Sequence, residues 1–139
     1  MLINLTEILK IAEEKQMAVS AFNTPNTESL NAVLNAAERL NVPVILMHAQ
    51  VHDYAARLNQ IGPVMVQAAK MAEVPVCVHL DHGEDLDYLE AALKIGFTGI
   101  MYDGSVLPYD ENLENTKKAV SMAASYGAGV EAELGALAS

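Results

Sequence analysis

Short apolar runs alternate along this chain with longer segments in which apolar residues recur at helical spacing. The chain starts with one helical segment, from Leu5 to about Gln16, behind Asn4 or Thr6 as the capping residue. Five apolar runs follow, at residues 17–23, 42–49, 74–83, 97–105 and 128–135. Between them, leucine, valine and alanine recur three or four residues apart, as on one face of a helix. The pattern therefore predicts strands separated by helices.

Each apolar run is nearly continuous rather than alternating apolar with polar residues. Strands of this kind lie in parallel sheets that helices cover on both faces, and parallel strands need long crossovers. The sequence thus predicts an α/β protein built from βαβ units, either a doubly wound sheet or a (β/α)8 barrel. Periodicity alone leaves both open. No run is followed by the GxGxxG or GxxxxGKS patterns of nucleotide-phosphate binding, which counts against the doubly wound alternative.

Polar residues gather where these runs end. They are Asn23, His48, His79, Asp81, His82, Asp103, Glu131 and Glu133. Both architectures place their active sites at the carboxyl ends of the strands. We therefore expect the functional site of this chain at that edge of the sheet.

The strongest local motif is HLDHG, residues 79–83. The period of two along a strand predicts that His79 and Asp81 point to one face and His82 to the other. This alternation should hold until the strand turns at Gly83. Imidazole and carboxylate groups suit zinc or a similar divalent ion, and a neighbouring carboxylate suits acid–base chemistry. In the alternative interpretation, Asp81 caps the following helix and the histidines are merely hydrogen-bonded.

Other chemically active side chains each have a structural interpretation as well. Asp103 ends the fourth run and precedes glycine and serine, a pattern also typical of an Asx-turn. Glu131 and Glu133 would share one face of the fifth strand. Buried together they would need a cation or hydrogen-bond donors, whereas at an exposed strand end they are simply solvated. Cys77 lies inside an apolar run and is most simply a small buried residue.

Charge and cysteine content argue against several classes of partner. With 8 basic and 18 acidic residues, the formal net charge is −10, the wrong sign for binding nucleic acid or an anionic membrane. The single cysteine cannot form an internal disulfide, which favours a reducing compartment. No stretch reaches the roughly 18 apolar residues of a membrane span, and the first residues do not resemble a signal peptide. We therefore expect a cytoplasmic protein with neither nucleic-acid nor membrane partners.

Three stretches together resemble one enzyme family: AFNTPN at 21–26, the residues from VPVCVHLDHG through NTKKAV at 74–120, and GVEAELGAL at 129–137. Within them HLDHG, GFT followed by DGS, and EAELG fall at strand ends in the order that the family has them. The chain resembles the N-terminal half of a class II, metal-dependent ketose-bisphosphate aldolase, the group of fructose- and tagatose-bisphosphate aldolases. The resemblance implies a (β/α)8 barrel, of which residues 1–139 supply an N-terminal helix, about four βα units and the fifth strand.

The resemblance also implies roles for individual residues. His82 resembles the zinc-ligand histidine, and Asp81 the catalytic aspartate beside it. Asp103 and Glu133 match acidic positions that in some members hold a second or mobile cation, divalent or monovalent. Asn23 matches an asparagine near the substrate. In the implied reaction, Zn²⁺ acts as a Lewis acid on the ketose carbonyl and Asp81 exchanges a proton with a substrate hydroxyl, giving dihydroxyacetone phosphate and an aldehyde.

The turn after the second strand departs from the family pattern. The family usually carries a serine near the substrate there, whereas this chain has MHAQVH at residues 47–52. If Ala49 occupies the serine position, one substrate contact is missing, and His48 or His52 could take its role. The resemblance thus makes His48, Ala49 and Gln50 candidate substrate-binding positions, and it leaves open which phosphorylated ketose is used.

The length of the chain bears on this interpretation. A complete barrel needs about 250 residues, and 139 is close to half of that. The family's other zinc histidines and phosphate-binding loops fall beyond Ser139, so we expect an inactive, truncated N-terminal half of a homodimeric or homotetrameric enzyme. Two alternatives remain. One is a non-catalytic half-barrel that dimerises or binds a partner, and the other is an unrelated enzyme that uses Asp81 and His82 on a doubly wound sheet.

Overall fold

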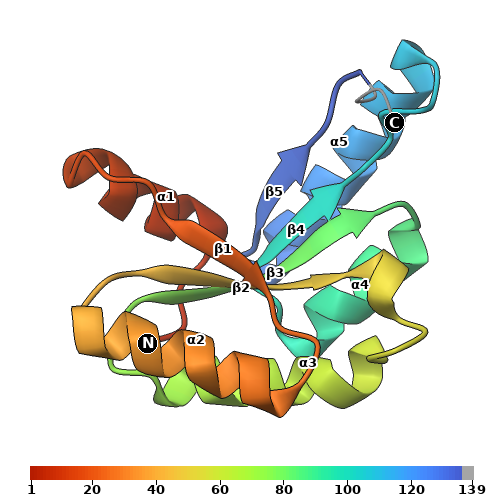
Figure 1. The fold of residues 1–139 in the computed structure, drawn as a ribbon. Coiled ribbons are helices and arrows are strands. Elements are labelled where there is room, and N and C mark those ends of the chain that lie inside the picture. The colour runs from red at the N-terminus through yellow and green to blue at the C-terminus, as the bar shows by residue number, and fades with distance from the viewer. Residues whose placement is uncertain (136–139) are drawn as a thin grey trace.

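A computed structural model describes residues 1–135 and shows a five-stranded parallel sheet (Figure 1). The strands are β1 (Ser20–Asn23), β2 (Val44–Ala49), β3 (Val76–Gly83), β4 (Gly99–Tyr102) and β5 (Gly129–Ala132). The helices are α1 (Leu5–Glu14), α2 (Thr27–Leu40), α3 (Leu58–Met71), α4 (Leu86–Ile95) and α5 (Tyr109–Tyr126), with a 3-10 helix, η1 (Gln50–His52), after β2. The predicted alternation of strands and helices is confirmed. Among the described residues, no helix combines the length and apolar character that crossing a membrane requires.

The order of the strands distinguishes the two architectures that the sequence left open. The strands lie in chain order, β1-β2-β3-β4-β5, and each pairs in parallel with the next. A doubly wound sheet reverses its strand order at a switch point, whereas each crossover of a (β/α)8 barrel advances by one strand in the same direction. The structure therefore corresponds to part of a barrel.

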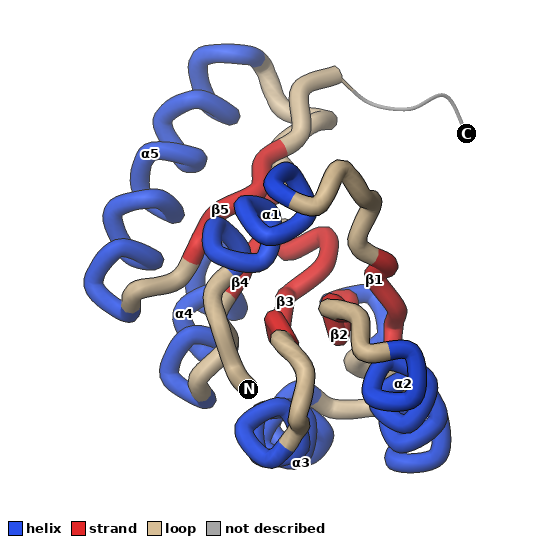
Figure 2. The backbone as a smooth tube through the Cα atoms, turned by 90° about the vertical axis from the view of Figure 1, so that its left-hand side faces the viewer, coloured by secondary structure: helices blue, strands red, loops and turns tan. Residues whose placement is uncertain are grey.

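Two apolar clusters hold the sheet between helices. Helices α2 to α5 run round the outside of the curved sheet, while α1 lies inside the curve (Figure 2). The larger cluster joins the outer helices to outward-facing strand residues such as Leu46 and Val78. The smaller cluster joins Ile8 of α1 to Ile45 and Cys77 on the inner face. Cys77 is therefore the small buried residue expected from the sequence, and burial raises the pKa of its thiol to about 12.

Local interactions explain where α1 begins and how closely it docks. Asn4 is the cap, because its side chain accepts a hydrogen bond from the Glu7 amide at 2.9 Å while its own amide donates to the Glu7 carboxylate at 2.8 Å. The helix ends at Glu14, slightly before the end expected from the sequence. A Cβ at Gly99 or Gly129 would lie 3.1 or 2.9 Å from the Leu5 Cβ. Glycine at both positions thus lets α1 approach the strands.

The register aligns inward-facing residues of neighbouring strands. Met47 pairs with His79, and Ala49 pairs with Asp81 nearer the carboxyl ends. His79 lies opposite Gly99, where a Cβ would come within 2.6 Å of the imidazole Nδ1. The absence of a side chain at Gly99 therefore makes room for a buried imidazole on the inner face.

Replacing Ile8 by alanine tests whether the docking of α1 stabilises the sheet. Ile8 is fully buried, so we expect Ile8→Ala to lower the free energy of unfolding by about 2–5 kcal/mol, because the substitution leaves a cavity. Leu9→Ala is the matched control. Leu9 is 51% exposed on the same helix, so Leu9→Ala should lower the free energy of unfolding by less than about 0.5 kcal/mol. Urea unfolding measures both values, and equal losses would contradict the docking described here.

Candidate metal centre and active site

An inner cluster of four side chains forms where β3, β4 and β5 end. The His82 Nδ1 atom lies 2.8 Å from an Asp103 carboxylate oxygen and 3.9 Å from one of Glu133. One ligand atom from each of these three residues lies within 4.8 Å of the other two, a spacing that one metal ion can bridge. Asp81 completes the inner cluster, with a carboxylate oxygen 3.9 Å from the His82 Nε2 atom.

The position of His82 corrects the strict alternation expected along β3. Leu80 is buried in the larger apolar cluster, on the outer face of the sheet, as alternation requires. Between Leu80 and Gly83, however, the register with β4 shifts, because β3 accommodates an extra residue in a β-bulge. His82 adopts a left-handed backbone conformation there, with a φ of 46°. The strand therefore turns at His82 rather than at Gly83, and the imidazole rejoins the inner face beside Asp81.

Asp81 does not cap the following helix. The cap of α4 is Asp85, whose carboxylate accepts a hydrogen bond from the Asp87 amide at 2.9 Å. Asp81 instead accepts a hydrogen bond from the Asn23 side-chain nitrogen at 3.0 Å. This contact spans β2, where the residue paired with Asp81 is Ala49, which carries only a methyl group. The structure thus brings Asn23 and Asp81 together across a small side chain.

Asp103 serves as both a turn residue and a partner of His82. One carboxylate oxygen accepts a hydrogen bond from the Ser105 amide at 3.1 Å, which forms the expected Asx-turn, and the other meets His82. Burial opposes ionisation, but the hydrogen bonds from Ser105 and His82 leave the pKa of Asp103 below its ordinary value. The hydrogen bond to Asp103 raises the pKa of His82. Partial burial opposes this shift, and the nearby carboxylates of Asp81 and Glu133 add to it. The inner cluster therefore stabilises positive charge.

The two glutamates of the fifth strand have different surroundings. The Glu131 side chain is 54% exposed, and its carboxylate lies 3.3 Å from Nε2 of the buried His79 without completing a hydrogen bond among the described residues. The His79 imidazole holds the pKa of Glu131 below its usual range, although burial opposes the shift. The Glu133 side chain is only 21% exposed and faces His82. The expectation of a glutamate solvated at an exposed strand end therefore describes Glu131 better than Glu133.

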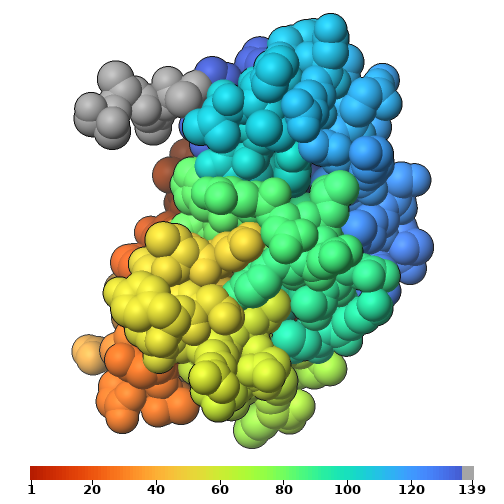
Figure 3. Space-filling model, turned by 90° about the vertical axis from the view of Figure 1, so that its right-hand side faces the viewer, coloured from red at the N-terminus to blue at the C-terminus, as the bar shows by residue number. Residues whose placement is uncertain are grey.

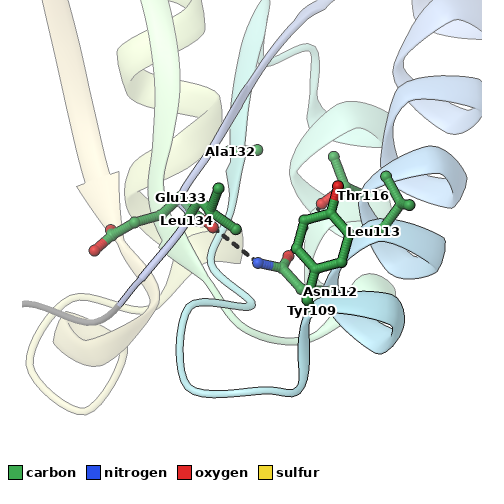
Figure 4. Close-up of a pocket in the computed structure, with 7 residues that line it drawn as sticks. All are labelled: Tyr109, Asn112, Leu113, Thr116, Ala132, Glu133 and Leu134. Carbon is green, nitrogen blue, oxygen red and sulfur yellow. Dashed lines mark hydrogen bonds between the residues drawn. The ribbon is translucent and has the colours of Figure 1, made fainter.

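A buried asparagine supports Glu133 from behind. A hollow of about 140 Å³ lies between α5 and the end of β5 (Figure 4) and is lined by Tyr109, Asn112, Leu113, Thr116, Ala132, Glu133 and Leu134. Asn112 is 5% exposed, and its side-chain nitrogen donates to the Glu133 backbone carbonyl at 2.9 Å. In Figure 4 the Glu133 carboxylate points away from this hollow. Asn112 was not predicted from the sequence, where it is one polar residue among many in a helical segment.

His48 does not join the inner cluster. It is 2% exposed on the outer face of β2, where its Nε2 atom lies 2.9 Å from the Tyr88 hydroxyl. Tyr88 donates its one hydroxyl hydrogen to an Asp53 oxygen at 2.8 Å, so the His48 ring must donate to Tyr88. The same Asp53 oxygen accepts a hydrogen bond from the amide of Leu58, the first residue of α3, at 2.7 Å. We call His48, Tyr88 and Asp53 the outer network.

The remaining candidates lie at the rim of the site. Ala49 is buried at the end of β2, on the same face as Asp81. Gln50 starts η1, and its side-chain oxygen accepts a hydrogen bond from the Glu84 amide at 3.0 Å. The structure therefore places Asn23 and Ala49 beside Asp81, Gln50 against the loop that follows β3, and His48 behind the sheet. The alternation of His48 with the outward-facing Leu46 is the signal in the sequence for its position.

The donor atoms of the inner cluster fit a divalent cation. Carboxylates this close to one another repel unless a cation or a proton compensates their charge. One imidazole with carboxylate oxygens is ligand chemistry found at Zn²⁺ sites. His82, Asp103 and Glu133 are the residues that can hold such an ion, and the Asp81 carboxylate lies beside them.

Asp53→Asn tests the outer network through its pH dependence. The Leu58 amide and the Tyr88 hydroxyl hold the pKa of Asp53 below its ordinary value of 3.8. A lowered pKa contributes stability that is fully present above pH 3.8 and is lost as the pH falls through the pKa of the folded state. We therefore expect Asp53→Asn to destabilise the chain at neutral pH and the difference to shrink on acidification. Urea unfolding at a series of pH values measures it, and a difference independent of pH would contradict the network.

The sequence is similar over almost its whole length to one family. Residues 3–139 match the family described as fructose-bisphosphate aldolase class-II. The chain is 39% identical over 138 residues to a fructose-bisphosphate aldolase of Helicobacter pylori strain J99, and 42% identical over 139 residues to one of Thermus caldophilus. Each alignment covers 99% of this chain and 45% of the relative, so the chain spans about half the length of the curated relatives it matches.

The fold is also similar to that of a solved aldolase. The structure is similar to the crystal structure of the YdjI aldolase from Escherichia coli K12, with a TM-score of 0.91 and 33% sequence identity, over 99% of this chain and 54% of that one. The resemblance seen in the sequence motifs is thereby confirmed. The chain belongs to the class II fructose-bisphosphate aldolase family.

Proposed function

We propose that residues 1–139 form the N-terminal half of the single barrel domain of a Zn²⁺-dependent aldolase. The complete enzyme would reversibly cleave a phosphorylated ketose, of the fructose or tagatose 1,6-bisphosphate type, into dihydroxyacetone phosphate and an aldehyde. The observation that carries this proposal is the inner cluster, in which His82, Asp103 and Glu133 offer ligand atoms within 4.8 Å of one another beside Asp81. A cytoplasmic location and a homodimeric or homotetrameric assembly belong to the same proposal.

His82 is the proposed metal ligand, with Asp103 and Glu133 as ligands of the same ion or of a second cation. When bound, Zn²⁺ supplies a Lewis acid for the ketose carbonyl. The chain itself holds the imidazole in place, because the β-bulge aims His82 inward and Asp103 binds its Nδ1 atom at 2.8 Å. Support of this kind for a ligating histidine is a regular feature of metal sites.

Asp81 is the proposed acid–base residue. Its carboxylate exchanges a proton with the substrate hydroxyl that becomes, or was, the aldehyde oxygen. The Asn23 side-chain nitrogen orients one carboxylate oxygen by donating to it at 3.0 Å, and the other oxygen faces His82. The Asn23 side-chain oxygen is buried and lacks a hydrogen-bond partner among the described residues. That oxygen is therefore the acceptor that a substrate hydroxyl would meet, next to the small side chain of Ala49.

A non-catalytic association unit is the second candidate, and one observation favours it. An apolar hollow of about 500 Å³ lies between β1 and α2, and Phe22 and Leu40 on its lining are 46% and 71% exposed. Apolar surface of this extent is usually covered by another element or another chain. On this interpretation the inner cluster has no catalytic role, and the isolated chain would associate without cleaving substrate.

Aldol cleavage and zinc content together test the proposed function. Both are measured on this chain and on the longest polypeptide that its gene encodes, with fructose or tagatose 1,6-bisphosphate as substrate. In the active form, we expect Asp81→Ala to lower kcat by about 10²- to 10⁴-fold with zinc content unchanged, because it removes only the acid–base group. His82→Ala should lower zinc content as well as activity, because it removes a ligand.

Asp110→Ala is the matched control, because Asp110 is an exposed acidic residue in the first turn of α5. It should change neither quantity. Equal zinc content in the Asp81→Ala and His82→Ala variants would overturn the assignment of His82. A longest form that binds no zinc and cleaves neither substrate would leave the association unit as the better description.

A further inference from the structure

The turn that carries His82 needs support from its surroundings. His82 has a φ of 46°, a left-handed conformation that costs free energy for any residue with a side chain. On the β4 side, the backbone provides that support, since the Asp103 amide donates to the Gly83 carbonyl at 2.9 Å. Gly83 approaches β4 closely. A Cβ at this position would lie 3.0 Å from the Met101 carbonyl oxygen, so a side chain would hinder the approach.

On the β2 side, one side chain holds the same turn. The Gln50 side-chain oxygen accepts a hydrogen bond from the Glu84 amide at 3.0 Å. Glu84 lies between the end of β3 and the start of α4. Its amide therefore forms no hydrogen bond within the sheet or within the helix. The turn is thus held from both neighbouring strands, by backbone on one side and by the Gln50 side chain on the other.

Gln50 is itself held in place by the outer network. His48 precedes it on β2 and Asp53 follows η1, and both contact the Tyr88 hydroxyl of α4, at 2.9 and 2.8 Å. The Asp53 amide also donates to the Gln50 backbone carbonyl at 3.0 Å. Figure 3 shows the segment after β2, in yellow, packed directly against the segment after β3, in green. The two connections therefore form one supported unit.

We propose that Gln50 is a positioning residue for His82. Its amide oxygen fixes the Glu84 backbone and, through the short turn, the direction in which the His82 imidazole enters the inner cluster. The sequence resemblance made Gln50 a candidate substrate-binding position, and the proposal gives it a positioning role instead. A neutral amide is suited to the task, because it provides an acceptor without adding charge to a group already rich in carboxylates. The metal-binding consequence rests on the proposed function of His82.

Cobalt binding by the longest polypeptide that the gene encodes tests this inference. Co²⁺ alone is the probe, and its visible absorption reports imidazole and carboxylate ligation. Gln50→Met keeps the length of the side chain but removes the acceptor, so we expect Co²⁺ affinity to fall by about 10-fold, as for other supports of metal ligands. Gln50→Glu keeps an acceptor oxygen and should bind Co²⁺ at least as tightly as the unsubstituted chain. Gln67→Met, at an exposed position of α3, should have no effect.

A second measurement uses the chain without metal, so that it is independent of the proposed function. In Gln50→Met, we expect the His82 ring resonances to shift and hydrogen exchange at the Glu84 amide to become at least about 10-fold faster, while the unfolding midpoint stays near that of Gln67→Met. Gln50→Glu should restore both signals. Unchanged His82 resonances in a folded Gln50→Met variant, or equal Co²⁺ affinity of the two Gln50 variants, would overturn the inference. If the longest polypeptide that the gene encodes, without substitutions, binds no Co²⁺, the metal-binding role of His82 fails, and the resonances alone decide the role of Gln50.

Discussion

Parallel pairing in chain order determines where the chemistry of this chain can lie. Because every strand runs in the same direction, all carboxyl ends meet at one edge, and side chains from β1, β3, β4 and β5 converge there. The opposite end of the inner face is filled by α1, with Ile8 packed near Ile45 and Cys77. The inner face of the sheet therefore has a packed end, which supplies stability, and a polar end, where the carboxylates and the His82 imidazole gather.

Much of this arrangement follows from the sequence alone. The apolar runs predict the strands, and polar residues at their ends, such as Asp103 and Glu133, predict the edge at which the site forms. The three stretches that contain AFNTPN, HLDHG and EAELG together indicate the family. Strand order could not be predicted from periodicity, because a helix of the same pattern can carry the chain in either direction along a sheet. Only the observed pairing β1-β2-β3-β4-β5 distinguishes a barrel segment from a doubly wound sheet.

The details that direct side chains into the site depend on contacts between distant residues. The bulge at His82 arises where Gly83 approaches β4, and a local period of two contains no sign of it. His48 resembled a residue of a polar turn, yet it is buried because Tyr88, which is 40 residues away in the sequence, accepts its hydrogen bond. Packing between elements sets both positions. Alternation with Leu46 indicates the face of β2 on which His48 lies, but neither its burial nor its partner Tyr88 could be predicted from neighbouring residues.

The electrostatics of the inner cluster suggest how one imidazole can serve a metal ion among so many carboxylates. The raised pKa of His82 and the lowered pKa of Asp103 have the same cause, a site that stabilises positive charge. Protons and metal ions compete for such a site, so the affinity of a bound metal ion would fall as the pH falls. Asp103 contacts the Nδ1 atom of the ring at 2.8 Å, and the Nε2 atom lies 3.9 Å from Asp81. The same contact that raises the pKa of His82 therefore also orients its ring, with the Nε2 atom toward Asp81.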